Sequence, residues 1–195
     1  MPAILVMGVS GSGKTTIADL LAQRLGWRLL EGDAFHPPAN VAKMRAGRPL
    51  TEEARWPWLR AIAAAMGQGG DAVVACSALK RAYRDILTGG HDGVTLVFLQ
   101  GTQSLIARRM AERRDHFMPA ALLDSQFATL EEPGAEEWAV VVSIDADPSV
   151  IVDRILDRYA RRVGVAAARQ TKEIPGARPA IQGSKPRAPG MKGAS

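Results

Sequence analysis

The sequence predicts an α/β fold, a doubly wound, five-stranded parallel sheet with helices on both faces. Three observations support this prediction. Five short apolar runs alternate with helical patterns between residues 1 and 165, as expected for right-handed βαβ units. Most of the runs are rich in Val, Ile and Leu without polar alternation, which is typical of strands covered on both faces. The first run leads directly into a glycine-rich loop that opens a helix.

The expected elements follow one another along the chain. Apolar residues with helical spacing come after the first strand, and Gly26 supplies the C-terminal stop of that helix. Near the other end, Asp147 and Pro148 read as the N-cap and the first position of a later helix. The expected strands are Ala3–Met7, Arg28–Leu30, Ala72–Cys76, Thr95–Leu99 and Ala139–Ile144.

The formal net charge of +5 lies in the last part of the chain of 195 residues. From residue 166 on, six basic residues stand against Glu173 alone, so residues 1–165 carry equal numbers of acidic and basic residues. The same segment is rich in Pro and Gly and cannot bury enough apolar surface to offset its ordering entropy. We therefore expect one domain over residues 1–165 and a basic, disordered tail over residues 166–195. The alternative for this tail is an arm that contacts nucleic acid or an acidic partner.

The sequence has one cysteine, so no disulfide can form within the chain and an oxidising compartment is not indicated. No cleavable leader is recognisable at the N-terminus, and no apolar run approaches the roughly 18–20 residues of a membrane helix. We expect a cytoplasmic protein without a membrane partner. Cys76 ends an apolar strand, which favours a packing role over chemistry.

Residues 8–15 read Gly-Val-Ser-Gly-Ser-Gly-Lys-Thr and match the phosphate-binding pattern G-x-x-x-x-G-K-[ST] in full. Such a loop points successive N–H groups at phosphate oxygens, and the following helix adds its positive dipole end. Lys14 can reach the β- and γ-phosphates, and the Thr15 hydroxyl can ligate Mg²⁺. The pattern therefore predicts a nucleoside triphosphate with magnesium. The expected nucleotide-binding residues are Gly8, Val9, Ser10, Gly11, Ser12, Gly13, Lys14, Thr15 and Thr16.

The loop does not fix the reaction. The chain contains no Asn-Lys-x-Asp for guanine and no Asp-x-x-Gly, which disfavours a GTPase switch. A small kinase needs an acceptor site, and Asp33 follows the second strand where ligands of such sheets collect. Its carboxylate can orient or deprotonate an attacking hydroxyl, and the alternative is a turn or N-cap aspartate. His36 is a second candidate, with bracing of the turn before Pro37 as its alternative.

Several further motifs occur in order along the chain, and together with the phosphate loop they resemble the small P-loop gluconokinases of the thermoresistant type. The resemblance covers about Ala3 to Val163. The motifs are Gly32-Asp33-x-x-His36-Pro37, Lys43-Met44-x-x-Gly47-x-Pro49-Leu50, Arg55-x-Pro57-Trp58-Leu59, Cys76-Ser77-Ala78-Leu79-Lys80-x-x-Tyr83-Arg84-Asp85, His116-Phe117-Met118 and Gln126-Phe127-x-x-Leu130-Glu131-x-Pro133.

This resemblance implies the P-loop kinase fold that shikimate and nucleoside monophosphate kinases also have. It implies transfer of the ATP γ-phosphate to the 6-hydroxyl of D-gluconate, with Mg²⁺ as cofactor and a homodimer as the assembly. It also implies a helical lid over about residues 108–133. Arg109 and Arg113 are four residues apart, so one helix face can present both to the transferred phosphoryl group. His116 and Gln126 are carried over as candidate acceptor contacts.

The acceptor side also follows from the chemistry of gluconate, which carries one carboxylate and five hydroxyls. Arginine can grip a carboxylate through two parallel hydrogen bonds, and Arg55 and Lys80 lie in the matched motifs. Ser77 is a further substrate-binding candidate. The alternative for both cations is a solvated surface position. Trp56 and Trp58 are expected to pack in the core because of their large apolar area.

One departure concerns magnesium, because no aspartate ends the third expected strand. Either Asp33 and water complete the Mg²⁺ shell with Thr15, or the second ligand lies elsewhere. Two alternatives to gluconate phosphorylation also stay open. One is a related small P-loop kinase for another hydroxylated acid or a nucleoside monophosphate. The other is a nucleic-acid-binding ATPase that uses the basic tail, although nucleic acid is not the expected partner.

Overall fold

The structure, a computed structural model, describes residues 2–46, 48, 50–89, 93–112 and 120–172. Five parallel strands form one sheet in the order β2-β3-β1-β4-β5, which confirms the expected fold class. Each strand lies within one or two residues of its expected position. The strands are β1 (Ala3–Met7), β2 (Arg28–Glu31), β3 (Ala72–Ala75), β4 (Val94–Gln100) and β5 (Val140–Ser143).

Helices connect the strands, and their ends follow local capping chemistry. Gly26 adopts φ 68° and ends α1, as expected for a residue that tolerates the left-handed region. The hydroxyls of Thr51 and Thr102 accept N–H groups at the starts of α3 and α5. The helices are α1 (Lys14–Leu25), η1 (Gly32–Phe35), α2 (Pro38–Arg45), α3 (Glu52–Met66), α4 (Arg81–Thr88), α5 (Gln103–Ala111), α6 (Ala120–Thr129), η2 (Ala135–Glu137) and α7 (Pro148–Lys172).

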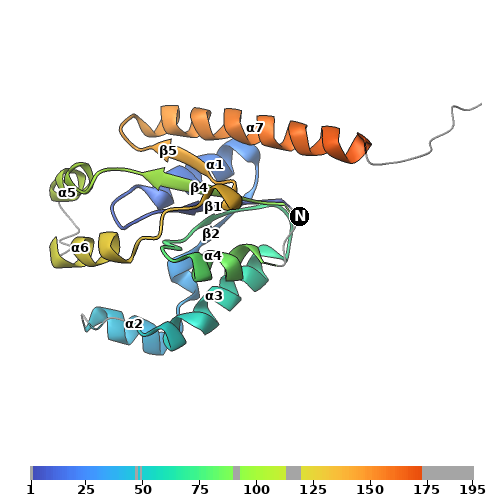
Figure 1. The fold of residues 1–195 in the computed structure, drawn as a ribbon. Helices are drawn as coiled ribbons and strands as arrows, with labels where there is room; N and C mark the ends of the chain where they lie inside the picture. The colour runs from blue at the N-terminus through green and yellow to red at the C-terminus, as the bar shows by residue number, and fades with distance from the viewer. Residues whose placement is uncertain (1, 47, 49, 90–92, 113–119, 173–195) are drawn as a thin grey trace, which may run out of the picture. The chain divides into compact units, whose positions relative to one another are not determined.

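The central strand β1 is buried on both faces because its side chains alternate between two cores. Ile4 and Val6 pack in the core that includes residues of α1 and the first part of α7. Leu5 and Met7 point the other way and pack with residues of α3 and α4. Helices therefore cover both faces of the sheet (Figure 1), which explains the uninterrupted apolar runs of the sequence.

The position of β1 also decides where a ligand can bind. It lies between β3 and β4, so the strand order reverses there. In open α/β sheets, ligands bind beyond the carboxyl ends of the strands at this kind of reversal. The loop from β1 to α1 and the segments after β2 and β3 therefore start from neighbouring strand ends.

The chain divides into two units, Met1–Arg161 and Arg162–Ser195. The described part of the second unit is the end of α7, which continues past Val165, where we expected the domain to end. Residues 173–195, most of the expected tail, lie outside the described residues. No helix in the described part of the chain is long and apolar enough to cross a membrane.

Candidate active site

The loop between β1 and α1 has the backbone of a phosphate cradle. Gly8, Gly11 and Gly13 adopt φ values of 147°, 82° and 91°, which side-chain-bearing residues rarely adopt. At Gly11 an added Cβ would lie 2.7 Å from Cγ of Met110, so α5 presses directly against the loop. The glycines therefore serve both the curl of the loop and its close packing under α5.

Hydrogen bonds fix the first half of this loop. The Val9 carbonyl accepts bonds from the Ser12 N–H at 3.2 Å and from Lys14 Nζ at 3.0 Å. The Gly8 N–H donates to the Ser77 carbonyl at 3.3 Å, which ties the loop to the segment after β3. The Ser12 hydroxyl is buried and has no partner among the described residues. This orphaned hydroxyl and the first N–H groups of α1 fit an anion that takes several hydrogen bonds.

Lys14 is half-buried at the start of α1. Burial lowers the pKa of its ammonium group, and the carboxylates of Asp33 and Glu31 act in the opposite direction. A bound triphosphate would add negative charge next to this ammonium group and so stabilise its charged form. Lys14 is thus placed to bind phosphate as a point charge.

Glu31 is a candidate that the sequence analysis missed. It ends β2, and its Oε2 accepts a hydrogen bond from Thr15 Oγ1 at 3.3 Å. The other carboxylate oxygen, Oε1, is buried without a partner among the described residues. A hydroxyl and a carboxylate are the hard oxygen donors that Mg²⁺ prefers. The end of the third strand carries no acidic residue, whereas the Glu31 carboxylate lies at the end of the second.

Asp33 and His36 lie on and just after η1, the short helix that follows β2. The Asp33 carboxylate is exposed and acts on both Lys14 and His36, favouring the charged form of each. Burial nevertheless lowers the pKa of His36, whose Nδ1 has no partner among the described residues. Trp58 of α3 stacks on His36 at 4.2 Å and donates from Nε1 to the Gly32 carbonyl at 2.7 Å. Trp58 therefore packs and positions this turn.

Arg55 and Lys80 lie over the same aromatic ring. The Arg55 Cζ and the Lys80 Nζ are each 5.9 Å from the ring centroid of Tyr83, within range of a cation–π contact. Lys80 also forms an ion pair with Glu52, and this hydrogen bond raises the pKa of the lysine. The structure thus brings two of the expected substrate-binding cations together. Ser77 is half-buried between Cys76 and the loop that carries Lys80.

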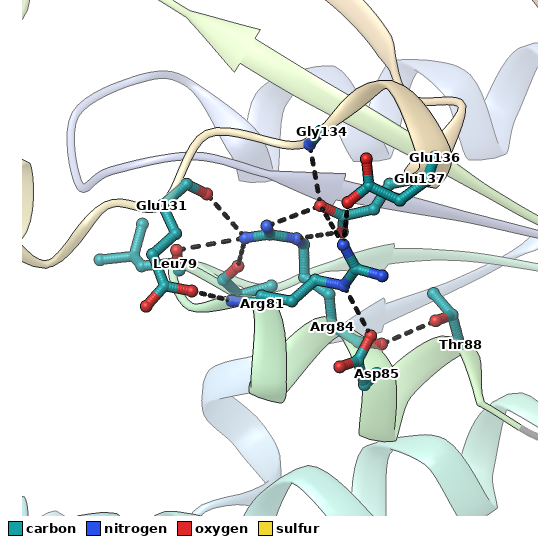
Figure 2. Close-up of polar contacts among 10 residues, drawn as sticks. Leu79, Arg81, Arg84, Asp85, Thr88, Glu131, Gly134, Glu136 and Glu137 are labelled. Atoms are coloured by element: carbon teal, nitrogen blue, oxygen red, sulfur yellow. Dashed lines mark hydrogen bonds and ion pairs between the residues drawn. The ribbon is translucent and has the colours of Figure 1, made fainter.

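A buried arginine supports the loop that carries Ser77 and Lys80 (Figure 2). Arg84 is 1% exposed, and its Nη1 donates to the carbonyls of Ala78 and Leu79 at 3.2 Å and of Glu131 at 2.9 Å. Its Nε and Nη2 donate to Glu137 at 2.6 and 2.9 Å, and this pairing lowers the pKa of Glu137. Arg84 therefore holds three loop carbonyls while its charge is compensated.

The expected lid residues are only partly described. Arg109 is half-buried and donates from Nη2 to the Ile144 carbonyl at 2.7 Å, next to the end of β5. Gln126 of α6 contacts the phosphate loop, because its amide exchanges two hydrogen bonds with Ser10. Arg113 and His116 lie outside the described residues, as does most of the segment between α5 and α6. The lid and the acceptor contact of Gln126 stay predictions.

Cys76 is fully buried, and desolvation raises its pKa to about 12. A thiol in this state has almost no thiolate at neutral pH and is not a nucleophile. This confirms the packing role expected from the sequence.

A parallel sheet whose central strand leads through G-x-x-x-x-G-K-T into a helix defines a P-loop protein that uses a nucleoside triphosphate. A model of the AAA domain family matches residues 4–133. The gluconokinase of Gluconobacter oxydans (strain 621H) is 46% identical over 160 residues, 80% of this chain and 90% of the relative. The crystal structure of a gluconokinase from Sinorhizobium meliloti 1021 has a TM-score of 0.80 and 43% identity, covering 89% of this chain and 98% of its own. The chain belongs to the gluconokinase family.

The type of gluconokinase expected from the motifs is also among the relatives. The thermoresistant gluconokinase of Escherichia coli (strain K12) is 42% identical over 147 residues, 73% of this chain and 83% of the relative. These comparisons confirm the resemblance that the ordered motifs indicated. They also confirm the expected class of enzyme, a kinase.

Proposed function

We propose that the protein transfers the γ-phosphoryl group of ATP to the 6-hydroxyl of D-gluconate, giving 6-phospho-D-gluconate and ADP. The observation that carries this proposal is the position of Asp33, whose carboxylate acts on both Lys14 of the phosphate loop and His36 of the acceptor side. This carboxylate, on η1 directly after β2, is therefore near enough to influence both a phosphate-loop lysine and a candidate acceptor residue. Membership of the gluconokinase family supports the same reaction.

On the nucleotide side, the loop of residues 8–16 and the N-terminus of α1 bind the phosphates. Lys14 neutralises charge on the β- and γ-phosphates. The Thr15 hydroxyl and the Glu31 carboxylate are the groups that would hold Mg²⁺, directly or through water. When bound, this ion would neutralise charge on the phosphate oxygens.

On the acceptor side, Arg55 and Lys80 bind the gluconate carboxylate from the two positions they share over Tyr83. His36 and Ser77 offer hydrogen bonds to hydroxyls of the sugar acid. Asp33 orients the 6-hydroxyl and accepts its proton as the oxygen attacks phosphorus.

Arginines near the end of α5 complete the proposal. Arg109 stabilises negative charge on the equatorial oxygens of the transferred group, as cations do in phosphoryl transfer. Its present bond to the Ile144 carbonyl keeps the guanidinium half-buried near the end of β5. Arg113 and His116 keep the roles predicted from the sequence, for charge stabilisation and acceptor contact respectively.

A coupled ADP-release assay tests the function against both alternatives. Purified protein with ATP and Mg²⁺ is given gluconate, shikimate, a nucleoside monophosphate or single-stranded DNA in parallel. Gluconate is expected to give turnover well above the ATP-only blank, and the product should carry its phosphate on the 6-oxygen by NMR. No turnover above the blank with gluconate would overturn the proposal. Stimulation by DNA alone would favour the ATPase alternative.

The role of Asp33 is tested by Asp33→Asn, which keeps the shape of the side chain and removes the base. Loss of a general base costs on the order of 10²–10⁴-fold in rate. We expect kcat to fall by at least about 100-fold while the KM for ATP changes little. Steady-state kinetics with each substrate varied in turn measure this split. Equal losses in kcat and in ATP affinity would show that Asp33 is a structural turn residue instead.

A further inference from the structure

Gln126 and Ser10 form a reciprocal pair of hydrogen bonds across 116 residues of chain. The Ser10 N–H donates to Gln126 Oε1 at 2.6 Å, and Gln126 Nε2 donates to Ser10 Oγ at 2.9 Å. Ser10 is the third residue of the phosphate loop, and Gln126 is half-buried on α6. Any movement of Ser10 that keeps these bonds must therefore be followed by this part of α6.

Five residues further along, the chain is fixed to the acceptor side. The Glu131 N–H donates to the Leu79 carbonyl at 2.9 Å, and the Glu131 carbonyl accepts from Arg84 Nη1 at 2.9 Å. The Glu131 carboxylate accepts the N–H of Arg81 at 2.6 Å (Figure 2). These bonds attach residue 131 to the loop between Ser77 and Arg81, which carries the proposed gluconate-binding residue Lys80.

The segment between the two attachment points is held by packing. The Leu130 N–H donates to the Phe127 carbonyl at 3.3 Å, which closes a turn at the end of α6. Leu123 is buried in the core that also includes α1, and Phe127 packs against that core. Leu130 packs against the cores on both faces of the sheet. A short, packed segment transmits a displacement better than a long free loop, because close-packed side chains deform little.

We propose that the segment from Gln126 to Glu131 couples the nucleotide site to the gluconate site, with both residues acting as positioning residues. Nucleotide binding at the phosphate loop fixes Ser10, and through Gln126 and Glu131 it fixes the loop that carries Lys80. The inference rests on the proposed function for the identity of the second ligand. Coupling of this kind is reciprocal, so gluconate must tighten nucleotide binding by the factor by which nucleotide tightens gluconate binding.

The test measures this factor directly. Isothermal titration gives the Kd of β,γ-methylene-ATP with Mg²⁺, with and without saturating gluconate. In the unaltered protein, gluconate is expected to lower this Kd by about fivefold or more. Gln126→Leu removes both bonds to Ser10 and is expected to bring the ratio of the two Kd values to within about twofold of one.

A matched control comes from the same two helices. Gln103 of α5 bonds to Asp124 of α6 and is exposed, and among the described residues it has no hydrogen bond to the phosphate loop. Gln103→Leu therefore makes the same substitution beside α6 and is expected to keep the full ratio.

A second variant, Glu131→Ala, removes the side-chain bond to the Arg81 N–H at the other end of the segment and is expected to lower the ratio as well. It keeps the test decisive if Gln126→Leu fails to fold by circular dichroism.

The outcomes separate this inference from the proposed function. If unaltered protein does not phosphorylate gluconate, the proposed function is wrong and the coupling falls with it. If gluconate is phosphorylated but the ratio of Kd values is one in the unaltered protein, only the coupling is wrong. The same holds if Gln126→Leu and Glu131→Ala keep the full ratio, or if Gln103→Leu loses as much of it as they do.

Discussion

At the scale of single residues, Glu31 places a carboxylate next to the hydroxyl that P-loop proteins use for magnesium. Its Oε1 is buried without a partner among the described residues, a costly arrangement unless a cation or water completes it. The bond from Thr15 fixes the other oxygen. We therefore propose that this acidic residue at the end of β2 takes the role for which the end of β3 offers no aspartate.

Glu31→Gln tests this assignment by removing the charge and keeping the side-chain length. We expect the Mg²⁺ concentration for half-maximal activity to rise by about 10–100-fold, as is usual when a group that orients a metal site is lost. A Mg²⁺ titration of the kinase assay at fixed ATP measures this value. An unchanged Mg²⁺ concentration for half-maximal activity would contradict a role of Glu31 in binding the metal.

Glu52 lies against one of the two cations proposed for the gluconate carboxylate. It forms an ion pair with Lys80, so it would compete with the substrate carboxylate that we propose binds there. We expect Glu52→Gln to lower the KM for gluconate by about two- to fivefold with little change in kcat, since exposed ion pairs contribute only about 0.2–1 kcal/mol.

The control for Glu52 is its neighbour in the first turn of α3. Glu53 carries the same charge, but its carboxylate forms hydrogen bonds with its own backbone N–H and with the Thr51 side chain. Glu53→Gln is therefore expected to leave the KM for gluconate unchanged. If both substitutions lowered the KM for gluconate equally, the effect would come from the negative charge at the start of α3 and not from the Glu52–Lys80 pair.

At the scale of elements, the strands were predictable because the inner strands β3, β1 and β4 are covered on both faces. Burial of both faces leaves no room for polar alternation, and the resulting apolar runs mark the strands of the sheet within one or two residues. Helix ends were predictable where a cap is local, as at Gly26 and Pro148. The end of α7 was not, because its last turns carry the composition that we took for a tail.

The part of the site that a motif of consecutive residues forms was predictable from the sequence. Residues 8–15 form the cradle that their pattern indicates. Arg55 and Lys80 come from separate motifs and lie over one ring, and their binding of gluconate stays a prediction. The contacts of Gln126 with Ser10 and of Arg84 with Glu137 join residues 116 and 53 positions apart. No local pattern carries such a pairing, because it depends on how the elements pack.

Helix α4 offers a comparison of a buried and an exposed arginine on one element. Arg84 pairs with Glu137 in the interior, whereas the exposed Arg81 pairs with Asp85 and Glu136 (Figure 2). Arg84→Met removes the guanidinium that pairs with Glu137 in the interior and bonds to three carbonyls, and we expect it to lower the free energy of unfolding by about 3–5 kcal/mol. Arg81→Met should cost far less, because the ion pairs of Arg81 are open to solvent. Urea denaturation followed by circular dichroism compares them, and equal losses would contradict the assigned role of Arg84.

At the scale of the whole molecule, the net charge of the chain and the charge of its catalytic unit are different quantities. Residues 1–165 are balanced, and every described residue with a proposed catalytic or binding role lies before residue 162. In the proposed reaction, the positive charge that acts on the substrates is local, at Lys14, Arg55, Lys80 and Arg109.

Removing residues 173–195 tests whether the basic segment contributes to the reaction. We expect kcat and both KM values to stay within about twofold of the full chain, because salt at physiological concentration screens charges over a Debye length of about 8 Å. Parallel kinase assays at 0.15 M salt, with and without the segment, give the comparison. A large loss of activity would assign the segment a catalytic or stabilising role.

The burial of Cys76 has a practical consequence. The only thiol of the protein directly follows β3, the neighbour of the central strand β1, and is buried in the core that includes residues of α3 and α4. A disulfide reagent can reach it only when that core opens, so the rate of thiol modification under native conditions reports the opening of the kinase core. The chain therefore carries an intrinsic chemical probe at its centre, and ligands that hold the core closed can be detected by the protection they give to one sulfur atom.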